Sequence, residues 1–341
     1  MDTSNKGGTR QLVSIVTSAY NCEKWIGELA QSILDQTYPN LEWIVVDDGS
    51  TDKTEEVVRQ AFSSFQQTSD RQRSLIYIKQ KNGGVGQATL NGFKHITGNY
   101  YLCIDADNRL RPSCLSILMN TLRAHPNAVF VQPDVAFFEV DGSKEIPLGT
   151  MADQDHYQIN PTIINSNTDP FYYFTINKIG FLYGIWFVDL TKFRQINPTL
   201  EFAPSRLCQD SPLLAQLYLC CNKVYISDVL ADIRIRKESL SHNHDSDDIG
   251  MKEIERTDSE SLTFLKVDPS LIAYGQNAIH LRWNDRLVKY YRDREDKVHF
   301  KQSLKTLCQY RKKVPQLKKL SHGSFYYRMS YLVTQLRKRS K

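Results

Sequence analysis

The chain has 341 residues, of which 41% are hydrophobic and 24% charged, and this ordinary globular composition excludes a largely disordered or fibrous protein. The length suits one large domain with a smaller appendage, or two domains. The seven cysteines form no C-x-x-C pair and no regular spacing, which argues against zinc modules and disulfide scaffolds. We expect no signal peptide and, without about 20 consecutive apolar residues, no membrane span.

The charge is unevenly distributed along the chain. Residues 297–341 contain 13 Lys and Arg and no acidic residue, whereas the preceding 296 residues contain 30 basic and 38 acidic ones. A basic end on an acidic body predicts contact with an anionic membrane surface or a charged polymer; the alternative is a solvated helical face at a homo-oligomer contact. No nucleic-acid module is recognisable, so we expect no nucleic-acid partner. The expected location is cytoplasmic, peripheral on the inner face of the cell membrane if the basic end binds lipid.

Apolar, β-branched runs alternate with amphipathic segments through the first 140 residues. The runs predict buried parallel strands, the last in a strand-rich stretch, at 12–18, 41–47, 75–78, 100–105 and 128–140. Helices are predicted at 21–35, from a cap at Ser50 or Thr51 to Phe62, at 86–96 and at 112–125. This alternation predicts a Rossmann-like, doubly wound, mostly parallel α/β sheet. Its ligands should bind at the carboxyl ends of strands, in the loops after residues 18, 47, 78 and 104.

The second half of the chain changes character. Residues 141–205 are expected to be irregular, 207–220 helical, and 224–236 one or two strands. Beyond about residue 250 the pattern is helical, and five apolar residues share one face: Ile279, Trp283, Leu287, Val288 and Tyr291. We therefore predict a catalytic domain over 1–250 and a basic helical C-terminal extension over 251–341, for contact with an acceptor, a membrane or another subunit.

Polar clusters follow the first two predicted strands. TSAYN at 17–21 places the ring of Tyr20 where it could stack on a flat base, although a Tyr packed beside the helix start would give the same pattern. DDGSTD at 47–52 places two carboxylates before a glycine turn. Turn and capping chemistry accounts for Asp47. It accounts least for Asp48, which is the candidate for accepting from the N–H of a base or from a ribose hydroxyl.

Two further loops indicate a ligand site. KNGGVGQATLNG at 81–92 allows a backbone to approach a ligand closely, but it has neither phosphate-loop nor dinucleotide spacing, which excludes ATPase and dehydrogenase functions. LCIDADN at 102–108 is a buried strand that ends in Asp105 and Asp107. Hard divalent cations prefer oxygen ligands and leave positions open for substrate phosphates. The two carboxylates could therefore hold Mg²⁺ or Mn²⁺, or one could bind ribose and the other the metal.

Two later segments complete the candidates. Asp210 in LCQDSPLLAQL lies at the predicted start of a helix, where it is either an N-terminal cap or a general base for a substrate hydroxyl. RIRKESLSHNHD at 234–245 supplies basic residues that could neutralise a leaving diphosphate. His242 or His244 could add a nitrogen ligand to the same metal, although histidines in polar loops are more often solvated.

Taken in order, VSIVTSAYN, DDGSTD, NGGVGQATLNG, IDADN and the Asp210 segment resemble inverting family 2 glycosyltransferases of the GT-A fold. The resemblance covers residues 10–245. It departs from the family at Ser18, where Pro is usual, and at Gln209, where Glu is usual. The helical region beyond it looks like the appended domains of bacterial surface-polymer transferases, such as those that decorate teichoic acid or capsule.

The resemblance implies roles for individual residues. Tyr20 would stack on uracil and Asp48 would bind the base. Asp105 would contact the ribose or the metal shell, Asp107 would ligate Mn²⁺ or Mg²⁺, and Asp210 would be the catalytic base. The implied nucleotide-sugar site comprises Ser18, Tyr20, Asp48, Gly84, Gln87 and Asp105, and the implied metal ligands are Asp107 and His242.

The implied activity is that of a metal-dependent, inverting hexosyl- or N-acetylhexosaminyltransferase. It would move a sugar from a UDP-sugar to a hydroxyl of a cell-surface polysaccharide, teichoic acid or lipid-linked glycan. Two other functions compete with it. A sugar nucleotidyltransferase would carry a Gly-rich basic signature where this chain has SAYNCEKW. A non-catalytic binding protein on a degenerate transferase fold would not need four intact aspartates, namely Asp48, Asp105, Asp107 and Asp210. The sugar preference would be set by 130–210, where Phe171–Phe174 and Trp186 could stack on a ring or pack in the core.

Overall fold

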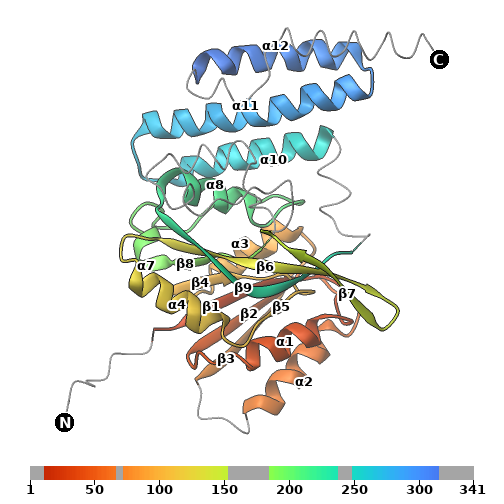
Figure 1. Cartoon of the computed structure of the whole chain (residues 1–341), viewed down its shortest axis with the longest axis vertical. Helices are drawn as coiled ribbons and strands as arrows, with labels where there is room; N and C mark the ends of the chain where they lie inside the picture. Colours follow the sequence, from red (N-terminus) through yellow and green to blue (C-terminus); the bar gives the residue numbers. More distant parts are fainter. Residues whose placement is uncertain (1–10, 67–71, 153–183, 237–247, 315–341) are drawn as a thin grey trace.

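The structure is a computed structural model that describes residues 11–66, 72–152, 184–236 and 248–314 (Figure 1). The strands in these ranges are β1 (Val13–Ala19), β2 (Leu41–Asp47), β3 (Arg73–Lys79), β4 (Tyr100–Cys103), β5 (Arg109–Leu110), β6 (Phe130–Asp141), β7 (Lys144–Thr150), β8 (Phe187–Asp189) and β9 (Lys223–Arg234). They join in the order β3-β2-β1-β4-β8-β6-β9-β5, with β7 paired to β6. β1 to β4 run parallel, whereas β8 is antiparallel to both β4 and β6. The predicted mostly parallel α/β sheet is confirmed.

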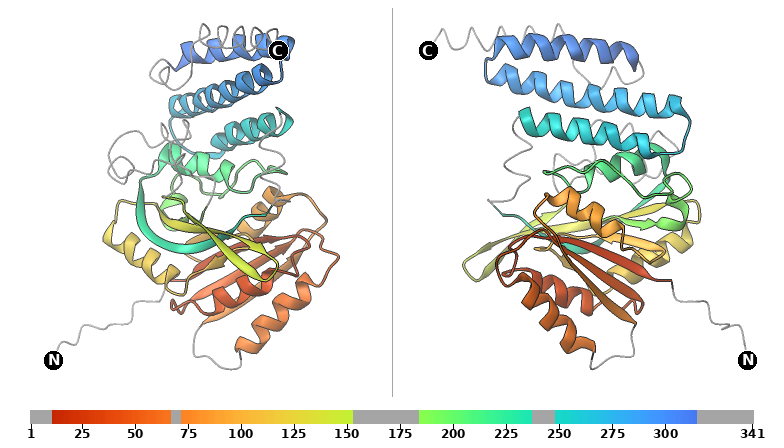
Figure 2. Two further views of the ribbon diagram at one scale, coloured as in Figure 1. Left: turned by 45° about the vertical axis from the view of Figure 1, so that its right-hand side comes forward. Right: turned by 180° about the vertical axis from the view of Figure 1, so that it is seen from behind.

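Helices cover both faces of this sheet, and further helices extend one side of the molecule. They are α1 (Ile26–Leu34), α2 (Thr54–Gln66), α3 (Val85–Phe93), α4 (Cys114–Ala124), α7 (Leu190–Phe193), α8 (Ser211–Cys220), α10 (Asp248–Ser261), α11 (Pro269–Asp293) and α12 (Lys297–Lys313). α1 and α2 lie on one face, and α3 and α8 on the other (Figure 2). α10, α11 and α12 follow α8 as successive layers, so α12 lies farthest from the sheet (Figure 1). Within the described ranges, no helix has the length and apolar character to cross a bilayer.

The apolar core runs without interruption from the sheet into the helical layers. β1 and β2 are buried β-branched runs, and Trp43 on β2 donates its Nε1–H to Thr17 Oγ1 on β1 at 3.1 Å. The same cluster of buried residues extends to Leu307 on α12. The five apolar residues predicted to share one face of a helix are all buried on α11. The seven cysteines are all free thiols.

Several predicted boundaries are wrong, and local polar contacts explain why. The first helix begins at Ile26, because Asn21 adopts a left-handed conformation with φ 47° and its side chain accepts from Thr51 N at 2.9 Å. The second begins at Thr54, whose N–H donates to Asp52 rather than to a cap at Ser50 or Thr51. The stretch predicted to be irregular contains β7, β8 and α7. Trp186 is buried, and Phe171–Phe174 lie outside the described residues.

The carboxyl group of Asp258 is buried where α10 packs on α8. Its burial should make the stability of the protein depend on pH. Burial raises the pKa of Asp258 to about 7, with Arg282 acting in the opposite direction. An unfolded Asp ionises near pH 4, so the folded state binds this proton more tightly, and the carboxyl costs stability increasingly as the pH rises from about 4 to 7. Calorimetry should therefore show the Tm of Asp258→Asn improving relative to wild type between about pH 5 and about pH 8. A Tm difference that does not change with pH would contradict this.

Candidate active site

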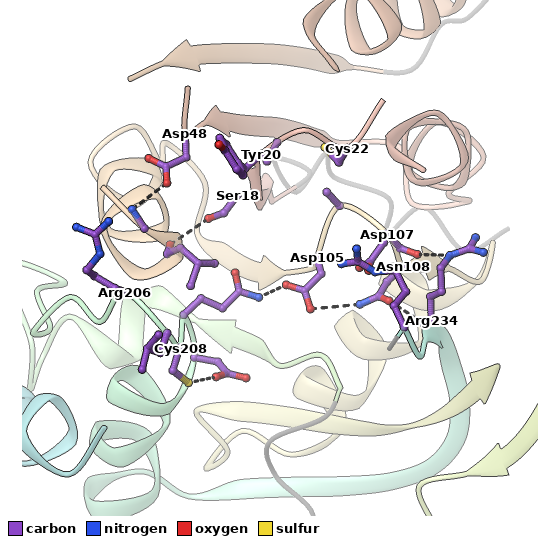
Figure 3. Close-up of a pocket in the computed structure, with 18 of the residues that line it drawn as sticks. Ser18, Tyr20, Cys22, Asp48, Asp105, Asp107, Asn108, Arg206, Cys208 and Arg234 are labelled. Carbon is purple, nitrogen blue, oxygen red and sulfur yellow. Dashed lines mark hydrogen bonds and ion pairs between the residues drawn. The ribbon is translucent and has the colours of Figure 1, made fainter. Parts of the chain in front are cut away.

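A cavity of about 660 Å³ opens where β1, β2 and β4 end (Figure 3). Residues at and just after the ends of β1 to β4 line it on one side. Residues 206–211, which lead into α8, and residues 233–236, at the end of β9, line it on the other. Ile254 of α10 and Trp283 of α11 also line it. The four loops expected to carry function therefore meet at one cavity, and the helical layers contribute to its wall.

Asp48 is buried beneath the glycine-rich loop. Its Oδ1 accepts from Gln80 Nε2 and Gly83 N, both at 2.8 Å, and its Oδ2 accepts from Gly84 N at 2.8 Å. A carboxylate offers about four acceptor positions. Asp48 therefore organises the loop with three of them and keeps capacity for one further donor at the edge of the cavity.

The other residues predicted for the nucleotide sugar divide into two groups. Ser18, Tyr20 and Gly84 line the cavity. Tyr20 is 54% exposed, so it is not packed beside the helix start, and its ring is accessible at the cavity mouth. Ser18 Oγ lies 2.9 Å from Thr89 Oγ1, with which it shares a hydrogen bond. Gln87 is not among the lining residues, because its side chain lies against Gly83.

The glycine-rich loop fits closely against the segment that leads to α8. Gly86 N donates to Ser205 O at 2.9 Å, and a Cβ at Gly86 would collide with that oxygen. Gly84 has φ 93°, and a Cβ there would lie 2.9 Å from Arg206 Cα. Glycine is required at these two positions because the two backbones touch. The loop and the segment therefore form one continuous part of the cavity wall.

Three carboxylates converge in the cavity: Asp105 and Asp107 after β4, and Asp210 before α8. Asp105 is exposed to the cavity. Desolvation by the protein around it and the charges of Asp107 and Asp210 raise the pKa of its carboxyl above the usual range. Gln209 Nε2 donates to Asp105 Oδ1. A Glu at this position would add a fourth negative group, so the amide suits its surroundings.

Two arginines at the end of β9 face the pair of aspartates. Arg236 Nε lies 2.6 Å from Asp107 Oδ2, and its guanidinium lies over the Trp25 ring at 4.4 Å. Arg234 Nε donates to the backbone oxygen of Asp107 at 3.2 Å, and its Nη2 donates to Glu28 at 2.8 Å. The basic residues expected to neutralise a diphosphate are therefore placed beside the D-x-D pair.

The oxygen donors at this site suit a cation that binds together with a substrate. In the described part of the chain, no group of three or more His, Cys, Asp or Glu side chains is arranged to hold a metal ion. Mg²⁺-like cations commonly bind through one or two carboxylates plus substrate phosphates and water, which is what Asp105 and Asp107 offer. A cation would also offset the repulsion that raises the pKa of Asp105. His242 lies outside the described residues.

Asp210 occupies the N-cap position of α8, as its sequence position predicts, but its side chain makes no capping hydrogen bond. Instead, its Oδ1 accepts from Cys208 Sγ at 2.9 Å. Burial and the neighbouring Asp210 raise the pKa of the Cys208 thiol well above its usual value, so the thiol stays protonated and remains a donor. Asp210 lines the cavity within reach of a bound hydroxyl compound.

The cavity residues that were not predicted from the sequence include Arg206, Ile254 and Trp283. Arg206 lies near Asp48 on one side of the cavity, opposite the D-x-D pair (Figure 3). Its position directly before LCQDSP was the only available signal. Ile254 and Trp283 were assigned only to an apolar helical region, because periodicity does not reveal which core residues border a cavity.

Comparison with known proteins indicates which family of enzymes the chain resembles. Residues 14–179 match the family described as Glycosyl transferase family 2. The segment that builds the strand-end side of the cavity therefore matches glycosyl transferase family 2, in agreement with the resemblance inferred from the motifs.

Two curated relatives share less than a third of their aligned residues with this chain. Glycosyltransferase GlyA of Streptococcus pneumoniae serotype 4 is 27% identical over 230 residues, which are 67% of this chain and 31% of that protein. Minor teichoic acid biosynthesis protein GgaB of Bacillus subtilis is 28% identical over 127 residues, which are 37% of this chain and 13% of that protein. The chain thus spans less than half the length of these curated relatives.

A solved structure extends the similarity to the helical layers. S. aureus TarS 1-349 in complex with UDP-GlcNAc superposes with a TM-score of 0.64 at 18% identity, over 94% of this chain and 88% of that chain. Because the overlap includes nearly all of this chain, the two proteins share the GT-A fold with its helical extension.

Proposed function

We propose that this chain is an inverting glycosyltransferase that moves a sugar from a UDP-sugar to a hydroxyl of a surface glycan, teichoic acid or lipid-linked acceptor. The observation that supports this best is the convergence of Asp105, Asp107 and Asp210 in one cavity, from a strand end and a helix start far apart in the sequence. A donor would have its diphosphate near the first two carboxylates and its anomeric carbon toward the third.

The proposed donor site uses the side of the cavity near β1 and β2. Tyr20 offers an accessible ring for stacking, and Asp48 keeps one acceptor position for the N–H of a base. TarS has been solved with UDP and with UDP-GlcNAc, which supports a UDP-sugar here. A hexosyl or N-acetylhexosaminyl group is the proposed cargo.

Asp107, with Asp105 beside it, would hold Mn²⁺ or Mg²⁺. A mannosyltransferase from Pyrobaculum calidifontis, with a TM-score of 0.50 to this chain, was solved with GDP-Man and Mn²⁺, which supports a metal here. The cation would supply positive charge to the departing diphosphate. Arg236 and Arg234 would add positive charge from the β9 side. Without a donor, Arg236 forms an ion pair with Asp107.

Asp210 is the proposed base. It takes the proton of the acceptor hydroxyl as that oxygen attacks the anomeric carbon, and the bond to the UDP oxygen breaks in the same step. The Cys208 thiol, by donating to Oδ1, orients the carboxylate. A single base without a matched nucleophile predicts inversion. The Asp210 side chain contacts Cys208 at the cavity and makes no capping hydrogen bond to α8. A non-catalytic protein on this fold would have no need of that arrangement.

A nucleotide panel tests the proposed donor class. Ligands that bind only the folded state raise the free energy of unfolding by mass action, and therefore raise Tm. At about 100 times Kd the gain in the free energy of unfolding is about 2.7 kcal/mol. We expect UDP and UDP-sugars with Mn²⁺ to raise Tm more than CDP, GDP or ADP compounds do. Equal shifts for all nucleotides, or none, would contradict a UDP-sugar donor.

We also propose that residues 251–341 form a unit that contacts an anionic surface through α12. Lys297, Lys301, Lys305 and Lys312 are exposed along one face of α12. Exposed Lys and Arg on α10 and α11 pair with acidic residues one turn away, whereas residues 297–341 contain no acid. Because this layer lies at the end of the molecule, the lysines could meet the inner face of a membrane.

Charge reversal tests this surface. Lys301→Glu/Lys305→Glu should reduce sedimentation with phosphatidylglycerol-containing vesicles by roughly 10-fold or more in low salt. The control Lys53→Glu/Lys94→Glu changes the same charge on exposed sites near the sheet and should have a smaller effect. Equal losses in both variants, or no binding by wild type, would contradict a lipid-binding face on α12.

A further inference from the structure

Residues 203–211, called the base-bearing segment here, lie between the glycine-rich loop and α10. On the loop side, Gly86 N donates to Ser205 O at 2.9 Å. On the other side, Glu253 of α10 accepts from Ser205 Oγ at 2.9 Å and from Arg206 N at 2.7 Å. One carboxylate therefore holds the two consecutive residues that touch the glycine-rich loop.

Asp258, also on α10, holds the far end of the segment. Its Oδ1 accepts from Ser211 Oγ at 2.7 Å, and both side chains are fully buried. Its Oδ2 accepts from Trp283 Nε1 at 3.4 Å, and Trp283 lines the cavity. Arg282 lies near enough to oppose the effect of burial on its pKa. Ser211 follows Asp210 directly, so a displacement at Ser211 moves the candidate base.

Burying a carboxylate between helices costs stability, and an apolar pair would fill the same space without that cost. Asp258 is therefore poorly explained as a stabilising contact. A positioning role explains it better, because a directional hydrogen bond holds Ser211 in one place and orientation, which an apolar contact would not do. Carboxylates at two points, five residues apart on α10, fix both ends of a short segment.

We propose that Glu253 and Asp258 are positioning residues that set the location of Asp210 and the glycine-rich loop, so that α10 is part of the catalytic machinery. This inference rests on the proposed function, since that function gives Asp210 its role as base. Misplacing a catalytic group by about 1 Å can cost roughly 100-fold in rate, while donor binding is left largely intact.

The experiment compares Glu253→Ala, Ser211→Ala, Asp258→Ala and Asp258→Asn with wild type. Glu260→Ala is the matched control, because Glu260 is an exposed acid of the same helix that forms an ion pair with Arg256 one turn away. UDP release from UDP-GlcNAc with water as acceptor gives kcat, and calorimetric titration with UDP gives Kd. Hydrogen exchange of residues 203–211 reports their order without any need for activity.

We expect Ser211→Ala and Asp258→Ala to lower kcat roughly 10-fold to 100-fold while Kd for UDP changes by less than about threefold. Asp258→Asn keeps an oxygen acceptor for Ser211 and should recover most of kcat. Exchange in 203–211 should accelerate in Glu253→Ala and Asp258→Ala but not in Glu260→Ala.

Unchanged kcat in these variants, or kcat and UDP affinity falling in parallel with Tm, would overturn the positioning role. If wild type releases no UDP from any UDP-sugar, the proposed function fails. In that case unchanged exchange in 203–211 would overturn the positioning role, and accelerated exchange would support it.

Discussion

Asp210→Asn is expected to lower UDP release and sugar transfer by roughly 100-fold to 10,000-fold, the range that a general base contributes. The amide keeps the size of the side chain and an oxygen for Cys208, but it cannot take the proton of an acceptor hydroxyl. Because the amide can keep the contact with Cys208, Tm should be nearly unchanged. Steady-state UDP release with the best donor of the nucleotide panel measures this effect.

The control for this variant is Asp228→Asn, which removes one carboxylate from an exposed position on β9 away from the cavity. It should behave as wild type. UDP affinity of Asp210→Asn should stay within about threefold of wild type, because the base acts in the transition state rather than in binding. Transfer within a factor of ten of wild type would refute Asp210 as the base.

Asp107→Asn is expected to remove the dependence of UDP binding on Mn²⁺. A carboxylate that shares a cation with a diphosphate contributes several kcal/mol, so UDP affinity with Mn²⁺ should fall about 100-fold. Without metal the variant should bind UDP at least as tightly as wild type, because Arg236 is released from its ion pair with Asp107 and can meet the diphosphate. Titration calorimetry with and without Mn²⁺ separates the two effects.

Arg236→Gln provides the complementary measurement. It should weaken metal-free binding of UDP, and it should retain most of the enhancement by Mn²⁺ because Asp107 is intact. If Asp107→Asn retains a full Mn²⁺ enhancement, the metal is held elsewhere and the D-x-D pair has another role.

The sequence was sufficient for the sheet and for most of the site because both depend on strong local signals. A buried β-branched run such as 41–47 has few alternatives to a central strand, and β2 begins and ends at those residues. Polar residues after such runs must meet at one edge of a parallel sheet, which brought Tyr20, Asp48, Asp105 and Asp107 to one cavity.

Other features depend on contacts between distant segments, which no local pattern reveals. The start of α1 is displaced because Asn21 and Thr51, thirty residues apart, hydrogen-bond across two loops. Asp210 has the sequence signature of a cap, and the sequence does not reveal that its side chain contacts Cys208 at the cavity and makes no capping hydrogen bond. No local pattern singles out Glu253 and Asp258, because the serines that they hold in 203–211 lie over forty residues away.

The stereochemistry of turnover tests the central claim most directly. Proton NMR of an early reaction, with an α-linked UDP-sugar and Mn²⁺, distinguishes the anomer that is first released or transferred before mutarotation mixes the two. A single displacement with Asp210 as base predicts that the β-anomer appears first and that Asp210→Asn does not produce it. First appearance of the α-anomer, or no turnover of any UDP-sugar, would contradict an inverting UDP-sugar transferase.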